Sequence, residues 1–311
     1  MKKYIVTGGA GFVGSTLADR LIEEGNEVII IDNLHTGSKE NVHPDAKFIE
    51  SDVLDIDFND EIFEDVDGIY HLGISSSSPM YKKDPSLVGK IINEHINVLE
   101  KAKSKKIPVV FASTSSVYSG QEPHHHEKME VLVTDYYTEG RYGMERISEL
   151  YANQHGVNVI GLRLFSVYGK KEKAKKTYAN LISQFMWDLQ DGKKPVVYGD
   201  GNQTRDFTYA DDIVEAFVLA MKHLEGKNGF SDFINAGTGK SYTINEMIDI
   251  LNKKLGTTIE KEHVIPNPIK CYVMHTLADT KKAKETIGFT AKHSLEDGID
   301  ELIKESKKQT Q

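Results

Sequence analysis

The sequence predicts an α/β fold in which a parallel β-sheet carries helices on both of its faces. Short apolar runs alternate with stretches of helical periodicity through the first half of the chain. The first apolar run also ends in a glycine-rich turn that opens into a helix. Strands joined by helices in this way pair in parallel. The expected strands lie at residues 4–6, 28–31, 47–50, 68–73, 109–112 and 157–164, and two long helices at residues 86–104 and 135–154.

Three glycines form the turn after the first strand. Gly8, Gly11 and Gly14 lie in the segment TGGAGFVG with the spacing GxxGxxG, a variant of the dinucleotide-binding pattern. The glycines allow a tight turn, a close approach of a pyrophosphate to the backbone, and close packing of the helix on the strand. The start of that helix, with Phe12 and Val13, then faces the diphosphate charge. The pattern predicts a Rossmann-type doubly wound sheet that binds a dinucleotide.

Acidic residues follow the second and third strands, where the rest of a dinucleotide would lie. Asp32 comes 18 residues after Gly14, where a carboxylate accepts hydrogen bonds from an adenosine ribose and repels a 2′-phosphate. NAD is therefore expected rather than NADP. Asp52 is either a partner of the adenine amino group or an aspartate that ends a strand in a turn, and both interpretations stay open. The other expected cofactor contacts are Asn33, Val53, Leu72, Gly73 and Ser113.

Composition excludes several classes of function. The chain has a net charge of −9 and scattered lysines, so a nucleic-acid partner is not expected. Cys271 is the only cysteine, which excludes an intrachain disulfide and a cysteine-rich metal site. No apolar stretch approaches the ~18 residues of a membrane helix, and the first strand begins almost directly after Met1. We therefore expect a cytoplasmic protein with no membrane segment.

Three consecutive histidines, His124, His125 and His126, raise the question of a metal site. Consecutive side chains cannot all face one ion, and no spaced set of cysteine, histidine or acidic residues accompanies them. We therefore expect a solvated loop and no metal.

The second half of the chain is less regular than the first. Residues 170–176 are predicted to form a basic loop, followed by a helix near residues 178–190. Thr243 is expected to begin a later helix, because Glu246 three residues on gives the spacing of a capping box.

Four segments together resemble the extended short-chain dehydrogenase/reductase family of sugar-nucleotide epimerases and dehydratases. They are TGGAGFVG at 7–14, ASTSSVY at 112–118, YTEGR at 137–141 and YGDGNQTRDFTYADD at 198–212. RLFSVYG at 163–169, NAGTG at 235–239 and LADTKKAKETIGF at 277–289 extend the likeness to nearly the whole chain.

The resemblance also implies a domain organisation. Residues 1–165 form an NAD-binding domain, to which residues 207–236 return. Residues 166–206 and 237–311 form a smaller α/β domain that binds the sugar nucleotide. Relatives commonly dimerise through two helices, here about residues 86–104 and 138–154, so we expect a homodimer.

The family mechanism assigns roles to three side chains. A tyrosine takes a proton from a sugar hydroxyl as hydride passes to NAD, the resulting 4-keto sugar rotates, and hydride returns to its other face. Tyr137 matches the tyrosine, and Thr114 matches the Ser/Thr that hydrogen-bonds the same oxygen. A free tyrosine has a pKa of about 10, so a nearby cation is needed for it to act as a base at neutral pH.

The main departure from the family is that cation. Relatives place a lysine four residues after the tyrosine, where it also holds the nicotinamide ribose, whereas this chain has Arg141. Arginine supplies a permanent charge, but its fork is larger and more rigid, so the ribose contact and the proton relay are open questions. The alternatives are a structural tyrosine at Tyr137 and a surface arginine at Arg141.

The resemblance places the nucleotide sugar as well. Arg205 in QTRD matches the arginine that clamps the substrate diphosphate, and a salt bridge to Asp206 or Asp211 is the alternative. No acid follows Thr114 to eliminate water from the sugar, which favours 4-epimerisation of a UDP-sugar over dehydration. Thr276 is small where relatives crowd the sugar 2-substituent, so a 2-acetamido sugar fits. The remaining expected contacts are Ser75, Ser115, Ser166, Tyr198 and Lys270.

Two other functions stay open on the sequence. One is a decarboxylase or reductase of the same fold that acts on a sugar nucleotide. The other is a protein that binds NAD and nucleotides but has lost catalysis through the change of lysine to Arg141.

Overall fold

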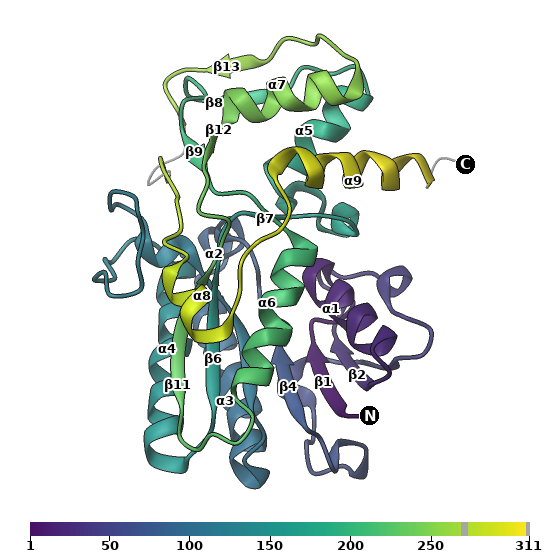
Figure 1. The fold of residues 1–311 in the computed structure, drawn as a ribbon, viewed down its shortest axis with the longest axis vertical. Helices are drawn as coiled ribbons and strands as arrows, with labels where there is room; N and C mark the ends of the chain where they lie inside the picture. The colour runs from purple at the N-terminus through teal and green to yellow at the C-terminus, as the bar shows by residue number, and fades with distance from the viewer. Residues whose placement is uncertain (269–272, 309–311) are drawn as a thin grey trace.

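The computed structural model describes residues 1–268 and 273–308. A large sheet with its helices forms the lower part of Figure 1, and a smaller group of helices and short strands lies above it. Lys270 and Cys271 lie outside the described residues. Within the described part, no helix combines the length and the apolar character needed to cross a bilayer.

The main sheet has seven strands in the order β11-β6-β5-β4-β1-β2-β3, and every neighbouring pair is parallel. This confirms the predicted α/β class and its doubly wound sheet. The strands are β1 (Lys3–Thr7), β2 (Glu27–Asp32), β3 (Lys47–Glu50), β4 (Gly68–His71), β5 (Val109–Thr114), β6 (Val159–Leu164) and β11 (Ser231–Ala236). The last of them joins the sheet far along the chain, beside β6.

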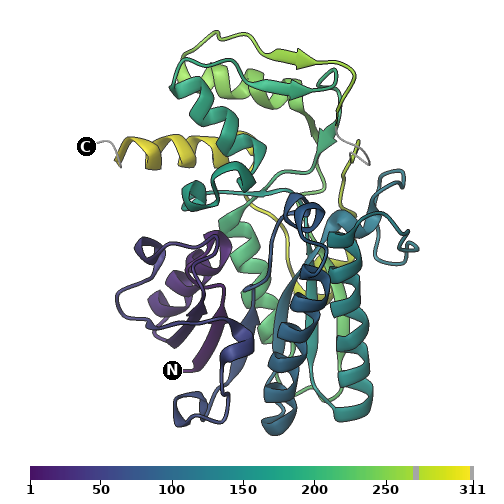
Figure 2. The same cartoon turned by 180° about the vertical axis from the view of Figure 1, so that it is seen from behind.

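Helices cover both faces of the sheet. α3 (Leu87–Lys105) and α4 (Tyr136–His155) lie side by side on one face, as Figure 2 shows. α1 (Phe12–Glu23) and α6 (Ala210–His223) pack together on the other face. Because both faces are covered, the central strands contain continuous apolar runs, such as Val28 to Ile31, which are at most 1% exposed.

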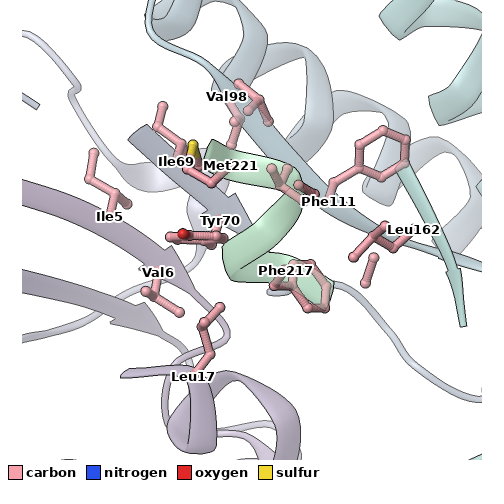
Figure 3. Packing of buried hydrophobic residues seen from close by; sticks show 14 of the residues in the cluster. Ile5, Val6, Leu17, Ile69, Tyr70, Val98, Phe111, Leu162, Phe217 and Met221 are labelled. Atoms are coloured by element: carbon pink, nitrogen blue, oxygen red, sulfur yellow. The ribbon is translucent and has the colours of Figure 1, made fainter. Parts of the chain in front are cut away.

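The core between α6 and the sheet is built around aromatic rings. Tyr70 of β4 lies between Tyr4 of β1 and Phe217 of α6, with ring centroids 5.4 and 6.4 Å away. Figure 3 shows these layers, with Leu17 of α1 on one side and Phe111 of β5 on the other. This packing fixes β1 and β4 as neighbours.

The smaller part has its own hydrophobic cluster. It is formed mainly by α5 (Leu181–Gln190), α7 (Ile244–Leu255) and α9 (Leu295–Lys308). The predicted capping box is confirmed, since Thr243 and Glu246 bond each other's backbone N–H at the start of α7. The remaining elements are α2 (Ser78–Lys83), β7 (Val167–Tyr168), β8 (Val196–Tyr198), β9 (Thr204–Arg205), β10 (Thr208–Tyr209), β12 (Tyr242–Thr243), β13 (Glu262–Val264) and α8 (Lys281–Ile287).

The expected basic loop is wrong in part. Residues Glu172–Tyr178 form 3₁₀ turns on either side of a kink at Lys176, and α5 begins only at Leu181. The reason is Glu172, whose carboxylate is buried and accepts hydrogen bonds from Asn180 N at 2.7 Å and Ser183 Oγ at 2.5 Å. A buried carboxylate with these partners orders the segment that its lysines would leave in solvent.

The expected solvated histidine loop is also wrong at its centre. His124 and His126 are exposed, but His125 is only 1% exposed. Its ring stacks on Tyr118 with centroids 5.1 Å apart, and Leu277 N donates to its Nδ1 at 3.3 Å. His125 therefore anchors the loop to the protein.

Replacing Gly14 by alanine is expected to destabilise the fold by roughly 1–3 kcal/mol, because a Cβ there would lie 2.1 Å from the carbonyl oxygen of Gly8. Urea unfolding measures the change. Gly89→Ala is the matched control, since nothing lies within 4 Å of a Cβ at that position in α3. It should stabilise the protein by up to about 1 kcal/mol. Equal stability of Gly14→Ala and the parent chain would show that the turn yields to a side chain without cost.

Candidate active site

One large cavity, of about 630 Å³, lies at the carboxyl ends of the central strands. The chain runs from β1 to β2 and β3 on one side and to β4, β5 and β6 on the other, so the strand order reverses between β1 and β4. Ligands of doubly wound sheets bind at such a reversal. The cavity is lined by the glycine-rich turn, the ends of β4 and β5, the first turns of α4, and residues of the smaller part.

The glycine-rich turn approaches the end of β4 more closely than side chains allow. Gly8 has a φ of +70°, and a Cβ on it would lie 2.6 Å from Gly73 N. α1 begins at Phe12, and its N-cap, Gly11, has no side chain to bond the first N–H groups, so these are open to an anionic ligand. A cradle of bare backbone around an uncapped helix start fits a diphosphate. Of the predicted residues, Gly8, Gly11, Phe12, Val13, Gly14, Leu72 and Gly73 line the cavity.

Asp32 binds the glycine-rich turn itself. Its Oδ2 accepts a hydrogen bond from Ala10 N at 3.0 Å, and its Oδ1 accepts one from Leu34 N at 2.7 Å. Burial raises the pKa of Asp32, although the backbone N–H groups of Leu34, Ala10 and Gly11 oppose the shift. Asp32 lines the cavity and also orders the turn, a second role that spacing alone did not indicate.

Asp52 is turned toward other side chains. Its Oδ2 accepts hydrogen bonds from Lys90 at 2.6 Å and from Asn33 at 3.2 Å, and its Oδ1 caps Leu54 N. Burial alone would raise the pKa of Asp52, but the bonds from Lys90, Leu54 and Asn33 hold it below its usual value. The cavity is lined on either side of it by Ser51 and Val53. Its contact with adenine stays a prediction.

Glu94, which was not predicted from the sequence, lines the same end of the cavity as Lys90. The residue is 4% exposed and lies one helical turn from Lys90, at 3.7 Å. Burial, followed by the charge of Asp52, raises the pKa of Glu94 to about 8, although Lys90 partly opposes the shift. Glu94 lies among the buried residues of α3, between Ile91 and Val98, and this spacing is the sequence signal that could have indicated its burial.

The predicted catalytic side chains converge at the other end of the cavity. Tyr137 lies in the first turn of α4, Thr114 ends β5, and both line the cavity with Arg141. Asp135 caps α4, accepting hydrogen bonds from Thr138 N at 2.8 Å and from Ser78 Oγ of α2 at 2.6 Å. Asp135 therefore connects α2 to the start of α4 and helps to position Tyr137 at the cavity.

Arg141 is held beneath Tyr137. Its guanidinium carbon lies 5.2 Å from the centroid of the Tyr137 ring. Nη1 donates to the carbonyl of Ala112 at 2.6 Å, and Nη2 donates to the carbonyl of Ser75 at 3.1 Å. The surface-arginine alternative is wrong, since the residue is 3% exposed. The fork of arginine thus binds β5 itself and the segment that follows β4, with two N–H groups held in a fixed geometry that a single ammonium lacks.

A buried ion pair supports β5 from behind. Ser113 Oγ donates to Glu145 Oε1 at 2.6 Å, and Arg163 binds both oxygens of Glu145 at 2.9 and 2.6 Å. Arg163 Nη1 also donates to Tyr118 at 2.9 Å. Neither Glu145 nor Arg163 was predicted from the sequence. The spacing of Glu145, two helical turns after Tyr137, places it toward the sheet and was the available signal.

The substrate residues lie on the opposite wall. Arg205 donates to the carbonyls of Thr204 at 2.8 Å and Val273 at 2.5 Å. Thr276 Oγ1 accepts from Asp206 N at 3.1 Å. Tyr198 lies apart on β8, 42% exposed and outside the cavity lining. Of the predicted substrate contacts, Ser75, Thr114, Ser115, Ser166, Arg205 and Thr276 line the cavity, and Lys270 falls outside the described residues.

Replacing Glu94 by glutamine is expected to change how stability depends on pH. The raised pKa, about 8 against an ordinary 4.5, means that the folded protein keeps a proton that the unfolded chain releases between these values. The free energy of unfolding of the parent chain should therefore fall, relative to that of Glu94→Gln, as pH rises through this range. Urea unfolding at several pH values measures the difference.

Glu100→Gln is the control for that comparison. Glu100 lies on the same helix but its side chain is 50% exposed, and hydrogen bonds from Tyr151 and Lys103 lower its pKa. Its substitution should not reproduce the effect. A parent chain and Glu94→Gln with parallel pH profiles would show that Glu94 titrates normally.

Comparison with known proteins identifies the family. Residues 4–237 match the model of the NAD dependent epimerase/dehydratase family. A putative UDP-glucose 4-epimerase of Methanocaldococcus jannaschii is 34% identical, with 96% of each chain covered. A UDP-glucuronate 4-epimerase of Thermodesulfobacterium geofontis is 31% identical over 99% of this chain and 97% of its own. UDP-glucuronic acid decarboxylase 1 of Danio rerio is also 31% identical, over 97% of this chain and 72% of its own.

Solved structures of the family have the same fold. UDP-glucose 4-epimerase of Thermotoga maritima, solved with UDP-glucose, superposes with a TM-score of 0.91 at 29% identity, covering 99% of this chain and 100% of its own. UDP-N-acetylglucosamine 4-epimerase of Methanobrevibacter ruminantium, in complex with UDP-N-acetylmuramic acid, gives 0.91 at 30% identity, covering 99% of each chain. With its parallel sheet, its bare glycine cradle and the cavity at the strand ends, the chain belongs to the NAD-dependent epimerase/dehydratase family, whose enzymes act on sugar nucleotides.

Proposed function

We propose that the protein is a 4-epimerase of a UDP-linked sugar, with Tyr137 as its catalytic base. The observation that carries the proposal is that Tyr137, Thr114 and the cation of Arg141 share one cavity with the glycine-rich turn and with Arg205. A cofactor on the turn and a nucleotide sugar on Arg205 would meet at Tyr137. The names of the relatives support the same reaction, since the two archaeal and two bacterial proteins described above are named 4-epimerases.

The cofactor site has the features that NAD requires. Backbone around Gly8 and Gly73 leaves no room for side chains, the start of α1 is uncapped, and the carboxylate of Asp32 lies at the end of β2. We propose that residues 1–165 and 207–236 hold NAD, and that residues 166–206 and 237–311 hold the sugar nucleotide. When bound, NAD supplies the hydride acceptor for the sugar and returns the hydride.

Each catalytic side chain then has one task. Tyr137 takes the proton of the sugar 4-hydroxyl as the 4-keto sugar forms, and gives it back afterwards. Thr114 hydrogen-bonds the same oxygen and holds it against Tyr137. Arg141, with its charge 5.2 Å from the ring, stabilises the phenolate and keeps its place through the carbonyls of Ala112 and Ser75. Arg205 pairs with the substrate diphosphate.

Two features bear on which reaction follows oxidation. Ser115 and Ser116 follow Thr114 in the cavity wall, and neither can protonate a leaving hydroxyl, so dehydration lacks its acid. Decarboxylation is the second candidate, because relatives named UDP-glucuronic acid decarboxylase match at 31% identity. In that case UDP-glucuronate would lose CO₂ after oxidation at C4.

Proton NMR of the protein with NAD and UDP-glucose, UDP-N-acetylglucosamine or UDP-glucuronate tests the proposal. We expect one of them to give the anomeric signal of its 4-epimer, and Tyr137→Phe to lower kcat by about 100-fold or more, the usual contribution of a general base. Tyr136→Phe, an exposed neighbour in the same turn, should leave kcat unchanged. A pentose product with released CO₂ would establish the decarboxylase instead.

Arg141→Lys separates the remaining outcomes. If NAD binds and none of the three sugars reacts, restored turnover in Arg141→Lys would identify a protein silenced by its arginine. If the parent chain is active, the lysine variant should be about tenfold slower, since a charged group loses one of its two carbonyl partners.

We also propose a cytoplasmic homodimer that associates through α3 and α4. These helices lie side by side on one face of the sheet. Leu150 of α4 is 53% exposed, and in the proposed dimer it would lie in the contact between the two chains. Leu150→Glu should shift the sedimentation mass from two chains to one, whereas Val196→Glu on β8 should leave it unchanged. A single-chain mass for the parent protein at micromolar concentration would exclude the dimer.

A further inference from the structure

Two imidazole rings are buried together, and the charge of Arg141 acts on both. His71 ends β4, His95 lies on α3, and each is 0% exposed. The rings stack with centroids 5.4 Å apart and planes 21° apart. Burial, followed by the charge of Arg141, lowers the pKa of His71 to about 3, and burial with the charges of His71 and Arg141 lowers the pKa of His95 well below its usual value. Both rings are therefore neutral, and each carries one N–H.

The hydrogen bonds of His95 fix its proton. Its Nε2 lies 2.8 Å from Ser148 Oγ. Ser148 has a single hydroxyl proton, which it donates to the carbonyl of Met144 at 2.9 Å. We therefore assign Nε2 of His95 as the donor to Ser148, which leaves a lone pair on its Nδ1. That lone pair is buried, and no described residue donates to it.

The hydrogen bonds of His71 give the opposite arrangement. Its Nδ1 lies 2.8 Å from Thr7 Oγ1, which already accepts a hydrogen bond from Gly73 N at 2.9 Å. The hydroxyl proton of Thr7 has a partner only if it points at Nδ1 of His71, so the ring carries its proton on Nε2. This N–H is buried and finds no acceptor within the described part of the chain.

Arg141 supplies a third buried group of this kind. Its Nη1 and Nη2 are bound to carbonyls, but its Nε–H is buried with no acceptor among residues 1–268 and 273–308. The cluster thus presents two unpaired donors, on His71 and Arg141, and one unpaired acceptor, on His95. Each unpaired buried group costs free energy, so an occupant that satisfies all three is strongly favoured.

We propose that an internal water molecule joins the three side chains, accepting hydrogen bonds from His71 Nε2–H and Arg141 Nε–H and donating one to His95 Nδ1. Buried waters typically make about three hydrogen bonds to groups left unpaired by the protein. A metal ion does not fit, because the cluster offers a single free lone pair beside the positive charge of Arg141. An anion does not fit either, because the lone pair of His95 would repel it.

The water makes His71 and His95 positioning residues for Arg141. Two carbonyls bind the Nη1 and Nη2 ends of the guanidinium, and the water would bind its Nε. Held at three points, the plane of the guanidinium is fixed relative to the Tyr137 ring. A lysine side chain at position 141 has no N–H in the place of Arg141 Nε. The histidine pair therefore matches an arginine rather than the lysine of relatives. Its effect on turnover rests on the proposed function, whereas the water itself does not.

Paired amide substitutions separate this role from a purely structural one. An asparagine amide reaches the place of a histidine Nδ1, and a glutamine amide reaches the place of Nε2. His95→Asn keeps an acceptor for the water and loses Ser148, whereas His95→Gln does the reverse. At position 71, glutamine keeps the donor to the water and asparagine keeps the bond to Thr7.

We expect His95→Asn and His71→Gln to retain more kcat than His95→Gln and His71→Asn, by about tenfold at each position, the loss expected when a charged group loses one hydrogen-bond partner. KM for the nucleotide sugar should change little, since neither histidine lines the cavity. If only the hydrogen bonds to Ser148 and Thr7 mattered, the order within each pair would be reversed, and that result would overturn the proposal.

A crystal structure at high resolution tests the water without any substrate. We expect a density peak at hydrogen-bond distance from His71 Nε2, His95 Nδ1 and Arg141 Nε. Direct contact of the three side chains, with no peak between them, would overturn the proposal even if the enzyme proves active. A clear peak in a protein that turns over none of the sugars would contradict the proposed function alone.

Discussion

The close approach of two stretches of bare backbone, at Gly8 and Gly73, is the constraint on which the site depends. β1 and β4 are neighbours in the sheet although the chain completes β2 and β3 between them. At their carboxyl ends the two strands meet so tightly that a Cβ on either glycine would lie within 3 Å of the other's backbone. The crevice beside this contact is therefore shaped by main chain, which few substitutions can reshape. Asp32 reinforces it by binding the turn at Ala10.

Arg141 combines a buried charge with structural contacts. A lysine would present one compact charge, whereas arginine spreads its charge over a fork with five donors. Here the fork ties Ala112, within β5, to Ser75, after β4. The cation under Tyr137 is thus also a brace between two neighbouring strand ends. One side chain thus supplies both the positive charge near Tyr137 and the hydrogen bonds that join β5 to the segment after β4.

The sequence predicted those parts of the molecule that depend on local patterns. The sheet, the glycine-rich turn and the cap at Thr243 follow from apolar periodicity, backbone freedom and short-range hydrogen bonds, and each leaves a trace within a few residues. The burial of Glu172 and His125 was not predicted, because a charged or imidazole side chain is expected in solvent unless its distant partners are known. Their burial depends on Ser183 and Leu277.

The candidate site residues also fall into two groups, those that local position in the sequence indicates and those that only the packing of helices brings to the site. Positions on a strand end or a first helical turn, such as Thr114 and Tyr137, line the cavity because topology brings all such ends together, and their roles stay predictions. Glu94, Glu145 and His95 lie on the buried sides of helices, where sequence gives only a periodic pattern of burial. Which of these polar residues face one another is decided by how α3 and α4 pack, and that is a property of the folded chain.

Both hydrophobic clusters are completed late in synthesis, because their residues lie far apart in the chain. α5 ends at Gln190, but α7, which packs against it, starts only at Ile244, about fifty residues later. At a synthesis rate of ~5–20 residues per second, the apolar side of α5 waits on the order of 3–10 s for that helix. β6 similarly remains an open sheet edge until β11 emerges. The nascent chain therefore passes through a stage in which one helix and one strand edge are uncovered, and such surfaces are prone to association with other chains.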